Sequence, residues 1–391
     1  MTQHAISRLV DEVTADVIAW RRHLHRHPEL SFQETNTSQY VYDTLASFGG
    51  LEISRPTKTS VVARLVGHKP GKTLAIRADM DALPITEETS FEFASENPGV
   101  MHACGHDGHT AMLLGAAKVL VGLKEHIEGE VRFLFQHAEE LFPGGAKQMV
   151  EAGVMEDVDL VIGIHLRSTD EPGRIGVKAG PVNAAPDTFR ATIIGSGGHA
   201  AYPHTTVDSV AIAAQAITNL QHVVARNTNP FDPLVLSITQ IFGGTADNVI
   251  PGSCEFRGTV RSYNPALRQS TPELMERVIR GVTEAHGASY EFEYVKGYAP
   301  VINDERVTQV VREALTEVFG EEVVVDGTPT MGGEDFSAFQ TEAPGTFFTV
   351  GAGYGPADTW YPHHHPKFAI DEAALPVGVQ SFVHLAFKLL S

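Results

Sequence analysis

The sequence has little cysteine, no long hydrophobic run and a shortage of positive charge, and each shortage excludes a class of protein. Cys104 and Cys254 are the two cysteines in 391 residues, so no disulfide framework can be derived. We expect a reducing compartment, where a cysteine serves as a metal ligand or a packed thiol. No segment approaches the ~20 apolar residues that span a bilayer, and residues 1–20 lack a signal-peptide pattern. A cytoplasmic location is therefore expected.

The charge balance is strongly acidic. The chain carries 29 Lys and Arg residues against 48 Asp and Glu residues, which gives a formal net charge of −19. Nucleic acids and anionic membranes bind proteins through basic faces, so we expect neither as a partner. The acidic balance is more typical of a soluble metabolic protein whose partner is a small molecule.

The order of the elements predicts an α/β fold. Hydrophobic residues make up 42% of the chain and charged residues 20%, which is a globular composition with length for two domains. Apolar, strand-like runs alternate with helical patterns, as in a mostly parallel sheet with covered faces. The predicted strands are 61–66, 73–79, 131–135 and 159–165, and the predicted helices include 35–48 and 107–123.

A second domain is predicted within the first. Between about residues 187 and 298 the pattern is strand, helix, two strands, helix, strand, which is the ferredoxin-like order. The strands are 188–194, 234–242, 254–261 and 290–294, and the helices are 209–225 and 272–286. After residue 298 the α/β alternation resumes. We therefore expect a discontinuous main domain, 1–183 and 299–391, with an inserted α+β domain at 184–298.

A dense group of metal-binding residue types lies at 101–109, within Met-His-Ala-Cys-Gly-His-Asp-Gly-His. Cys104 and His106 flank a glycine that lets the backbone bend tightly. A thiolate with an imidazole suits a borderline-soft divalent ion, with zinc as the first choice. The alternative is a packed cysteine beside polar residues that cap the following helix.

Two adjacent carboxylates, Glu139 and Glu140, follow the apolar strand at 131–135. Neighbouring side chains of a regular strand point to opposite faces, so the two converge only in a loop, which Pro143-Gly144-Gly145 supports. One Glu would then bind metal while the other takes a proton from water. The alternative is an exposed acidic helix start, where Glu is favoured.

Three further signals complete the candidate site. His165 ends an apolar strand, a histidine triplet lies at 363–365, and Asp79 ends the strand at 73–79. A lone histidine at a strand end is often structural, a triplet also occurs in solvated loops, and Asp79 either makes a turn or orients a ligand histidine. Together, however, Cys104, His106, a Glu, His165 and a C-terminal His provide the ligands for two metal ions.

These motifs together resemble metallopeptidase family 20, in particular its amidohydrolase branch. That branch includes hippurate hydrolases, bacterial N-acyl-amino-acid amidohydrolases and plant auxin-conjugate hydrolases. The matching segments run in family order through nearly the whole chain. They are 22–32, 77–84, 101–110, 137–140, 163–166, 198–199, 247–251, 332–336 and 364–368.

The resemblance implies a role for each residue of the candidate metal site. Glu139 is implied as the general base. His364 is the implied C-terminal ligand because it lies two residues before Pro366, although the family usually has Ser or Asn where His365 stands. The implied fold is a catalytic α/β domain with an inserted lid domain. The implied ligands of two divalent ions (Zn, Mn, Co or Ni) are Cys104, His106, Glu140, His165 and His364.

The resemblance also implies a homodimer in which a lid histidine enters the partner's site and stabilises the oxyanion. His199 matches that histidine, while Asn248 and Arg261 match the residues that bind the substrate carboxylate. An arginine fork suits a carboxylate, and Arg257 on the same strand is a rival to Arg261. From the residues alone, His199 is as well explained as a turn cap, and Arg261 as a surface ion pair. Glu334 is expected near the site without an assigned role.

The resulting hypothesis is a metal-dependent amidohydrolase that cleaves N-acyl amino acids into a carboxylic acid and a free amino acid. The alternatives are a dipeptidase or aminopeptidase on the same two-metal site, and a non-catalytic protein that binds metal or amino acids. A second carboxylate beside a ligand argues against mere binding, which does not require it. The sequence does not specify the acyl group, the amino-acid side chain or the metal.

Overall fold

The computed structural model describes residues 3–391 and divides into two compact units. The first unit consists of the chain up to Val182 together with Ile302–Pro329 and Asp335–Ser391. The second consists of Asn183–Val301 and Thr330–Glu334. No helix among the described residues has the length and apolar composition to cross a membrane.

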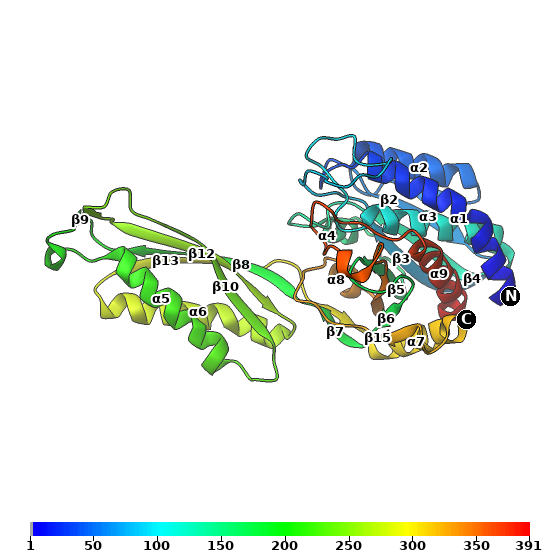
Figure 1. The fold of residues 1–391 in the computed structure, drawn as a ribbon. Coiled ribbons are helices and arrows are strands. Elements are labelled where there is room, and N and C mark those ends of the chain that lie inside the picture. The colour runs from blue at the N-terminus through cyan, green and yellow to red at the C-terminus, as the bar shows by residue number, and fades with distance from the viewer. Residues whose placement is uncertain (1–2) are drawn as a thin grey trace. The chain divides into compact units, whose positions relative to one another are not determined.

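The first unit is built on an eight-stranded mixed sheet with the order β1-β2-β4-β3-β5-β16-β6-β15 (Figure 1). Its central strands β4, β3, β5 and β16 run parallel, whereas β1, β2 and the β16/β6 pair are antiparallel. The α/β class predicted from the sequence is therefore confirmed. The strands are β1 (Glu52–Ser54), β2 (Val61–Val66), β3 (Lys69–Asp79), β4 (Glu128–Gln136), β5 (Leu160–Arg167), β6 (Ile175–Val177), β15 (Val324–Asp326) and β16 (Gly345–Gly351).

A layer of contacting helices covers this sheet. It comprises α1 (Gln3–Arg26), α2 (Thr35–Phe48), α3 (His106–Gly122), α7 (Glu305–Phe319) and α9 (Ala374–Leu390). The short helices α4 (Gly145–Glu151) and α8 (Ser337–Gln340) contact each other, and α4 also contacts β4.

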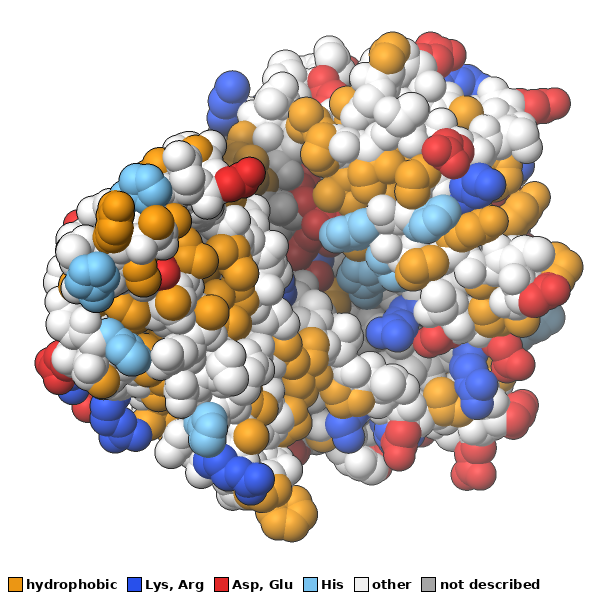
Figure 2. All heavy atoms as spheres, turned by 60° about the vertical axis from the view of Figure 1, so that its left-hand side comes forward, with side chains coloured by type: hydrophobic (Ala, Val, Ile, Leu, Met, Phe, Trp, Pro, Cys, Tyr) orange, Lys and Arg blue, Asp and Glu red, His pale blue; other side chains and the backbone are white. Residues whose placement is uncertain are grey.

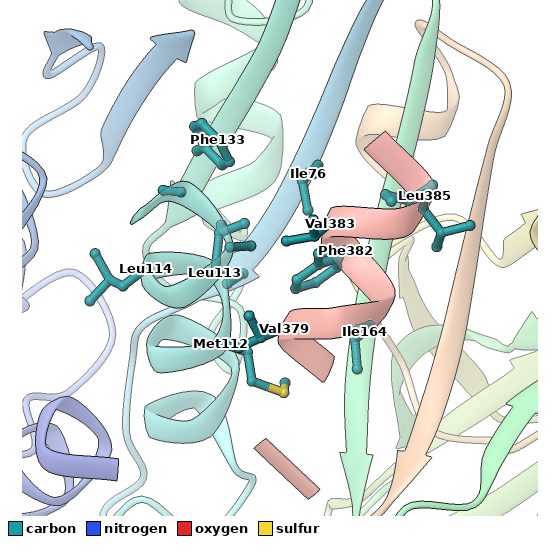
Figure 3. Packing of buried hydrophobic residues seen from close by; sticks show 14 of the residues in the cluster. Ile76, Met112, Leu113, Leu114, Phe133, Ile164, Val379, Phe382, Val383 and Leu385 are labelled. Atoms are coloured by element: carbon teal, nitrogen blue, oxygen red, sulfur yellow. The ribbon is translucent and has the colours of Figure 1, made fainter. Parts of the chain in front are cut away.

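Helix α3 lies at the centre of this layer, and all of its residues from His106 to Ala117 are buried. A helix that is apolar on all sides packs in this way inside a larger protein. In Figure 3, Met112 of α3 lies beside Val379 of α9, in the same core as Ile76 of β3. Gly378 allows this close approach, because a Cβ atom there would lie 2.0 Å from Met112 Sδ. The position of α3, and of the residues at its N-terminus, is thus fixed by core packing.

The carboxyl ends of the central strands meet at one edge of the sheet. In the β3/β4 register Asp79 pairs with Gln136, the last residue of each strand. In the β5/β16 register His165 pairs with Thr349. Helix α3 begins at this edge after Gly105, whose φ of +90° is readily adopted only by glycine. In parallel α/β sheets this edge is where ligands bind.

The second unit has a four-stranded antiparallel sheet with the order β10-β12-β8-β13, and α5 and α6 lie along it (Figure 1). In chain order this is the predicted ferredoxin-like β-α-β-β-α-β pattern. The elements are β8 (Ala185–Ile194), α5 (Ser209–Asn227), β10 (Leu234–Gly243), β12 (Ser253–Ser262), α6 (Pro265–Ala285) and β13 (Ser289–Val295). Two small ribbons are formed by β9 (Gly198–His199) with β11 (Val249–Ile250), and by β7 (Gly180–Asn183) with β14 (Val301–Asn303).

The predicted start of the helix at Pro272 is wrong, because α6 begins at Pro265 and contains Pro272. Asn264 caps the helix by accepting hydrogen bonds from the N–H groups of Ala266 and Leu267. An Asn cap followed by proline at the first helical position is a strong start signal. Pro272 lies about two turns into the helix.

Candidate metal centre

The structure brings the five candidate ligands and Glu139 together in the first unit. Cys104, His106 and His165 each offer a ligand atom within 4.8 Å of the others. A second group of this kind joins Cys104 to Glu140 and His364, and a third joins His106 to Glu139 and Glu140. The groups share members, so they form one continuous cluster at the carboxyl edge of the sheet.

Hydrogen bonds of the histidine rings direct their lone pairs into this cluster. His106 Nδ1 donates to the Asp81 carbonyl at 2.9 Å, and the buried His106 Nε2 has no hydrogen-bond partner. His165 Nδ1 donates to the Leu166 carbonyl at 2.8 Å, and its Nε2 lies 3.6 Å from Cys104 Sγ. Because a backbone carbonyl takes the Nδ1 proton in each case, Nε2 is the ring nitrogen left to bind a metal.

His109 is close to the cluster but is already saturated. Its Nδ1 donates to Asp79 Oδ1 at 2.6 Å, and its Nε2 accepts the Leu166 N–H at 2.8 Å. Neither ring nitrogen therefore has a lone pair for a metal. His109 instead ties the end of β3 to β5.

The histidine triplet contributes two residues to the cluster. His364 Nε2 lies 3.1 Å from Glu140 Oε1, and the His364 N–H donates to the Ala103 carbonyl at 2.8 Å. His363 Nδ1 lies 3.6 Å from Cys104 Sγ, and burial lowers the pKa of His363 to about 3. His365 stacks on Tyr361 with ring centroids 4.5 Å apart.

The cluster carries an excess of negative charge. Burial, followed by the charges of Glu140 and Glu139, raises the pKa of the Cys104 thiol well above its usual value. Burial disfavours a charged His106, yet Asp79 and Asp81 outweigh burial and raise its pKa to about 10. A buried site of this kind is stabilised by added cations. The orphaned His106 Nε2 and the mixed sulfur, nitrogen and oxygen donors fit borderline divalent ions.

Asp79 lies beside His106, with its Oδ2 3.5 Å from His106 Nε2. Its hydrogen bonds, however, go to His109 and to Arg77. Asp81 is the residue that orients His106, through its carbonyl and through an Oδ1 at 3.3 Å from His106 Nδ1. The motif at 77–84 thus contributes two buried aspartates with different tasks.

A buried arginine holds the strand ends under this cluster. Arg77 donates to Asp79 Oδ2 at 2.7 Å, to Gln136 Oε1 at 2.7 Å and to Asp335 Oδ1 at 3.1 Å. Asp335 also accepts from Gln136 Nε2 and from the Ala146 N–H. Although burial favours the neutral acid, Arg77 and the neighbouring histidines keep the pKa of Asp79 well below its usual value. Arg77 therefore supplies the charge that permits carboxylates at this depth.

Glu139 and Glu140 lie in the predicted loop, since α4 begins only at Gly145. The alternative of an acidic helix start is therefore wrong. The Ala138 N–H donates to Glu34 Oε1 at 2.8 Å, and the Glu140 N–H donates to Asp81 Oδ2 at 3.0 Å. Glu139 is 7% exposed between these two anchored peptides.

The candidate lid residues lie in the second unit. His199 is exposed on β9, where it pairs with Val249, and the Ala200 N–H donates to the Asn248 carbonyl at 3.0 Å. His199 and Asn248 are therefore neighbours. Figure 2 shows histidine and hydrophobic side chains on the surface of this unit. Glu334 also belongs to the second unit.

Arg261 lies at the other end of the second unit's sheet. It pairs with Pro186, whereas Ser253 at the start of β12 pairs with Ile194. Eight residues of strand separate the two ends by about 26 Å, so one chain does not bring Arg261 close to His199. Arg261 is half-buried and donates to Thr259 Oγ1 at 3.0 Å, whereas the exposed Arg257 is paired with Glu255 at 2.7 Å.

Sequence reasoning missed the residues that support the cluster from behind. Glu34, Asp81, Arg77 and Asp335 are all buried, and each hydrogen-bonds a segment far away in the chain. The available signal was the position of Arg77 and Asp81 in the same strand-end motif as Asp79. No local pattern singles out Glu34.

The comparisons with known proteins agree with this chemistry. A family model described as peptidase family M20/M25/M40 matches residues 75–388. A Geobacillus stearothermophilus protein named N-acyl-L-amino acid amidohydrolase is 66% identical over 303 residues, which cover 78% of this chain and 82% of that protein. N-acetylcysteine deacetylase of Bacillus subtilis is 42% identical, with 96% of this chain and 97% of that protein covered.

Thermostable carboxypeptidase 1 of Saccharolobus solfataricus is also 42% identical, with 97% of this chain and 96% of that protein covered. Among solved structures, the Bacillus subtilis YxeP protein is described as a dinuclear metal binding peptidase from the M20 family. It is 38% identical with a TM-score of 0.86, and the match covers 97% of this chain and 99% of that chain.

The Arg77 network makes a testable contribution to stability. We expect Arg77→Met to lower the free energy of unfolding of the metal-free protein by about 3–5 kcal/mol, because it leaves two buried carboxylates without their cation. Urea unfolding followed by circular dichroism measures the loss. The control is Arg257→Met, which removes an exposed ion pair and should cost less than ~1 kcal/mol. Equal losses in the two variants would contradict this account.

Proposed function

The chain belongs to peptidase family M20/M25/M40, and we propose that it is a two-metal amidohydrolase of N-acyl amino acids. The observation that carries the proposal is the position of Glu139. Five candidate ligands surround the centre, and Glu139 adds a further carboxylate within 4.8 Å of His106 and Glu140. A protein that only bound metal would not need this additional carboxylate.

The proposed roles follow from the chemistry of each side chain. Cys104, His106, Glu140, His165 and His364 hold two divalent ions, for which Zn and Mn are the first candidates and Co and Ni the others. When bound, the ions supply Lewis-acid polarisation of the acyl carbonyl and lower the pKa of the attacking water. Cys104 binds as the thiolate, which the positive charge stabilises.

Glu139 carries out the proton transfers in this proposal. Its carboxylate takes a proton from the attacking water and returns it to the nitrogen of the leaving amine. His199 of a partner subunit donates a hydrogen bond to the developing oxyanion. The amide C–N bond breaks, and the products are a carboxylic acid and a free amino acid.

The names of the relatives support this substrate class. Two relatives are named for N-acyl amino acids, including the one that is 66% identical. Because one relative is named a carboxypeptidase, peptide cleavage at the same metal centre is the second candidate function. Asn248 and Arg261 are the proposed contacts for the substrate carboxylate, with Arg257 as the rival. A cytoplasmic location is part of the proposal, supported by two cysteines that are both free thiols.

A homodimer is also proposed, with the second unit as the lid and dimerisation domain. Strand β10 is an edge of its sheet, and Ile241 and Phe242 at the end of this strand are exposed. An open edge with exposed apolar side chains is normally covered by another element or chain. A second subunit there would also provide His199 from outside the chain that holds the metal.

The substrate class can be tested with a panel of N-acetyl, N-benzoyl and indole-acyl amino acids beside dipeptides. Amino acid release is measured with ninhydrin, on chelator-treated enzyme with and without Zn²⁺, Mn²⁺, Co²⁺ or Ni²⁺. We expect metal-dependent release from the acyl amino acids. Cleavage of dipeptides alone would favour the peptidase candidate, and no release from any compound by folded, metal-loaded protein would contradict the enzyme proposal.

Glu139→Gln tests the general base. We expect both metal ions to remain bound, as measured by atomic emission, while kcat falls by about 10²–10⁴-fold. Glu140→Gln is the comparison, because its loss should instead lower the metal content. Full activity of the Glu139→Gln protein would contradict the assignment.

Mixing two inactive variants tests the dimer and the role of His199. We expect His199→Ala and Glu139→Gln subunits, once dissociated and reassociated together, to recover about a quarter of the wild-type activity. Half of the dimers are then mixed, and one site of each contains both Glu139 and the partner's His199. Each variant reassociated alone is the control. No recovery in verified mixed dimers, or a monomer by light scattering, would contradict the proposal.

A further inference from the structure

One carboxylate oxygen holds two residues with unusual backbone conformations. Phe32 has a φ of +65° and Ala138 a φ of +49°, which side-chain-bearing residues rarely adopt. The N–H groups of both residues donate to Glu34 Oε1, at 2.9 Å and 2.8 Å. The rings of Phe32 and His137 are also in contact, with centroids 5.6 Å apart. Two loops more than 100 positions apart in the sequence are thus joined at one atom.

The loop that joins Glu34 is the one that carries Glu139. Glu34 holds the peptide that joins His137 to Ala138, through the Ala138 N–H, and Asp81 holds the peptide that joins Glu139 to Glu140, through the Glu140 N–H. Asp81 is itself bound by Ser31 Oγ at 2.6 Å. Both anchors of Glu139 are therefore tied to the segment 31–34, which supplies no candidate metal ligand.

We propose that Glu34 is a positioning residue, which sets the direction of the Glu139 carboxylate through its hydrogen bond with the Ala138 N–H. The inference rests on the proposed function, because it assigns a task in amide hydrolysis. A backbone with a φ of +49° at Ala138 turns the next residue toward the centre. Without an acceptor at the position of Oε1, the Ala138 N–H is buried with no partner and the loop relaxes to another conformation.

The two oxygens of Glu34 have separate partners. Oε1 accepts the two backbone N–H groups, and Oε2 accepts the Thr59 hydroxyl at 2.9 Å. Burial, followed by the charge of Asp81, raises the pKa of Glu34 to about 7. Oε1 remains an acceptor whether or not the group is protonated. The conformation of the Glu139 loop therefore depends on the position of this oxygen and not on its charge.

Reach and charge can be separated by substitution. Glu34→Gln keeps the length and an acceptor oxygen but removes the charge, whereas Glu34→Asp keeps the charge and shortens the side chain by one methylene. We expect Glu34→Gln to retain kcat within about threefold of wild type and Glu34→Asp to lose about 10²-fold, with KM changed less than threefold in both. A higher kcat for Glu34→Asp than for Glu34→Gln would overturn the proposal.

Glu29→Asp is the matched control. Glu29 is a carboxylate of the same N-terminal region, and its Oε2 accepts the Thr37 N–H at 2.8 Å, at the start of α2 and not in the Glu139 loop. We expect this variant to keep the wild-type kcat. A comparable loss of kcat in Glu29→Asp and Glu34→Asp would show that the loss comes from general disruption of the N-terminal region. That result would overturn the proposal. Metal content and melting temperature are measured for every variant, and two bound ions in Glu34→Asp are expected.

A double variant shows whether Glu34 acts through Glu139. In a Glu139→Gln background the base is already lost, so adding Glu34→Asp should lower kcat by less than about threefold further, since residues that act as a unit are not additive. A further loss of about 10²-fold would overturn the proposal. Failure of the proposed function is distinguishable, because the wild-type protein would then release no amino acid from any acyl amino acid.

Discussion

The guanidinium of Arg77 is the interaction on which the functional edge of the sheet depends. It lies fully buried between the ends of β3 and β4 and bonds to Asp79, Gln136 and Asp335. Without this positive charge, carboxyl groups at this depth would be protonated, because desolvation of the ionised form is costly. With Arg77 present, Asp79 holds His109 and Asp335 holds the start of α4. The candidate ligands then lie on a frame whose own charges are balanced.

The centre in front of this frame carries carboxylates of its own. Glu139 and Glu140 each offer an oxygen within 4.8 Å of a ligand atom of His106. Although burial lowers the pKa of His106, the charges of Asp79 and Asp81, followed by that of Glu140, raise it. The same arrangement that makes the metal-free centre unfavourable makes a divalent ion favourable there.

Local signals predicted much of the fold. The helix at 35–48 and the strand at 61–66 were placed to the residue, because glycine ends the first and a valine-rich apolar run marks the second. The ferredoxin-like order was also predictable, since each of its elements is long and periodic. The start of α6 was not predictable from the prolines alone, because Pro265 and Pro272 are both compatible with the first helical position. The Asn264 cap identifies Pro265 as that position.

The candidate site was predictable where its residues lie in short motifs near strand ends and helix starts. Cys104 and His106 lie at the start of α3, Glu140 follows β4 and His165 lies near the end of β5, so the sheet topology brings them to one edge. Glu34 was missed because its partner at Ala138 lies in a distant loop, and a hydrogen bond from a backbone N–H leaves no trace in residue type. The distance between Arg261 and His199 was missed because register, not residue identity, sets it.

The interruption of the first unit has a consequence for the order in which the protein folds during synthesis. Strand β16 lies between β5 and β6, and α9 packs on α3, but both are encoded after residue 344. At ~5–20 residues per second, the 391 − 182 = 209 residues that follow Val182 take about 10–40 s to emerge. Throughout that time β5 has an open edge and α3 an uncovered apolar face, whereas the second unit is complete in sequence by Glu334. The inserted unit therefore has the shorter wait, and the first unit depends on β16 and α9, which lie in the last 391 − 344 = 47 residues of this sequence, to complete its core.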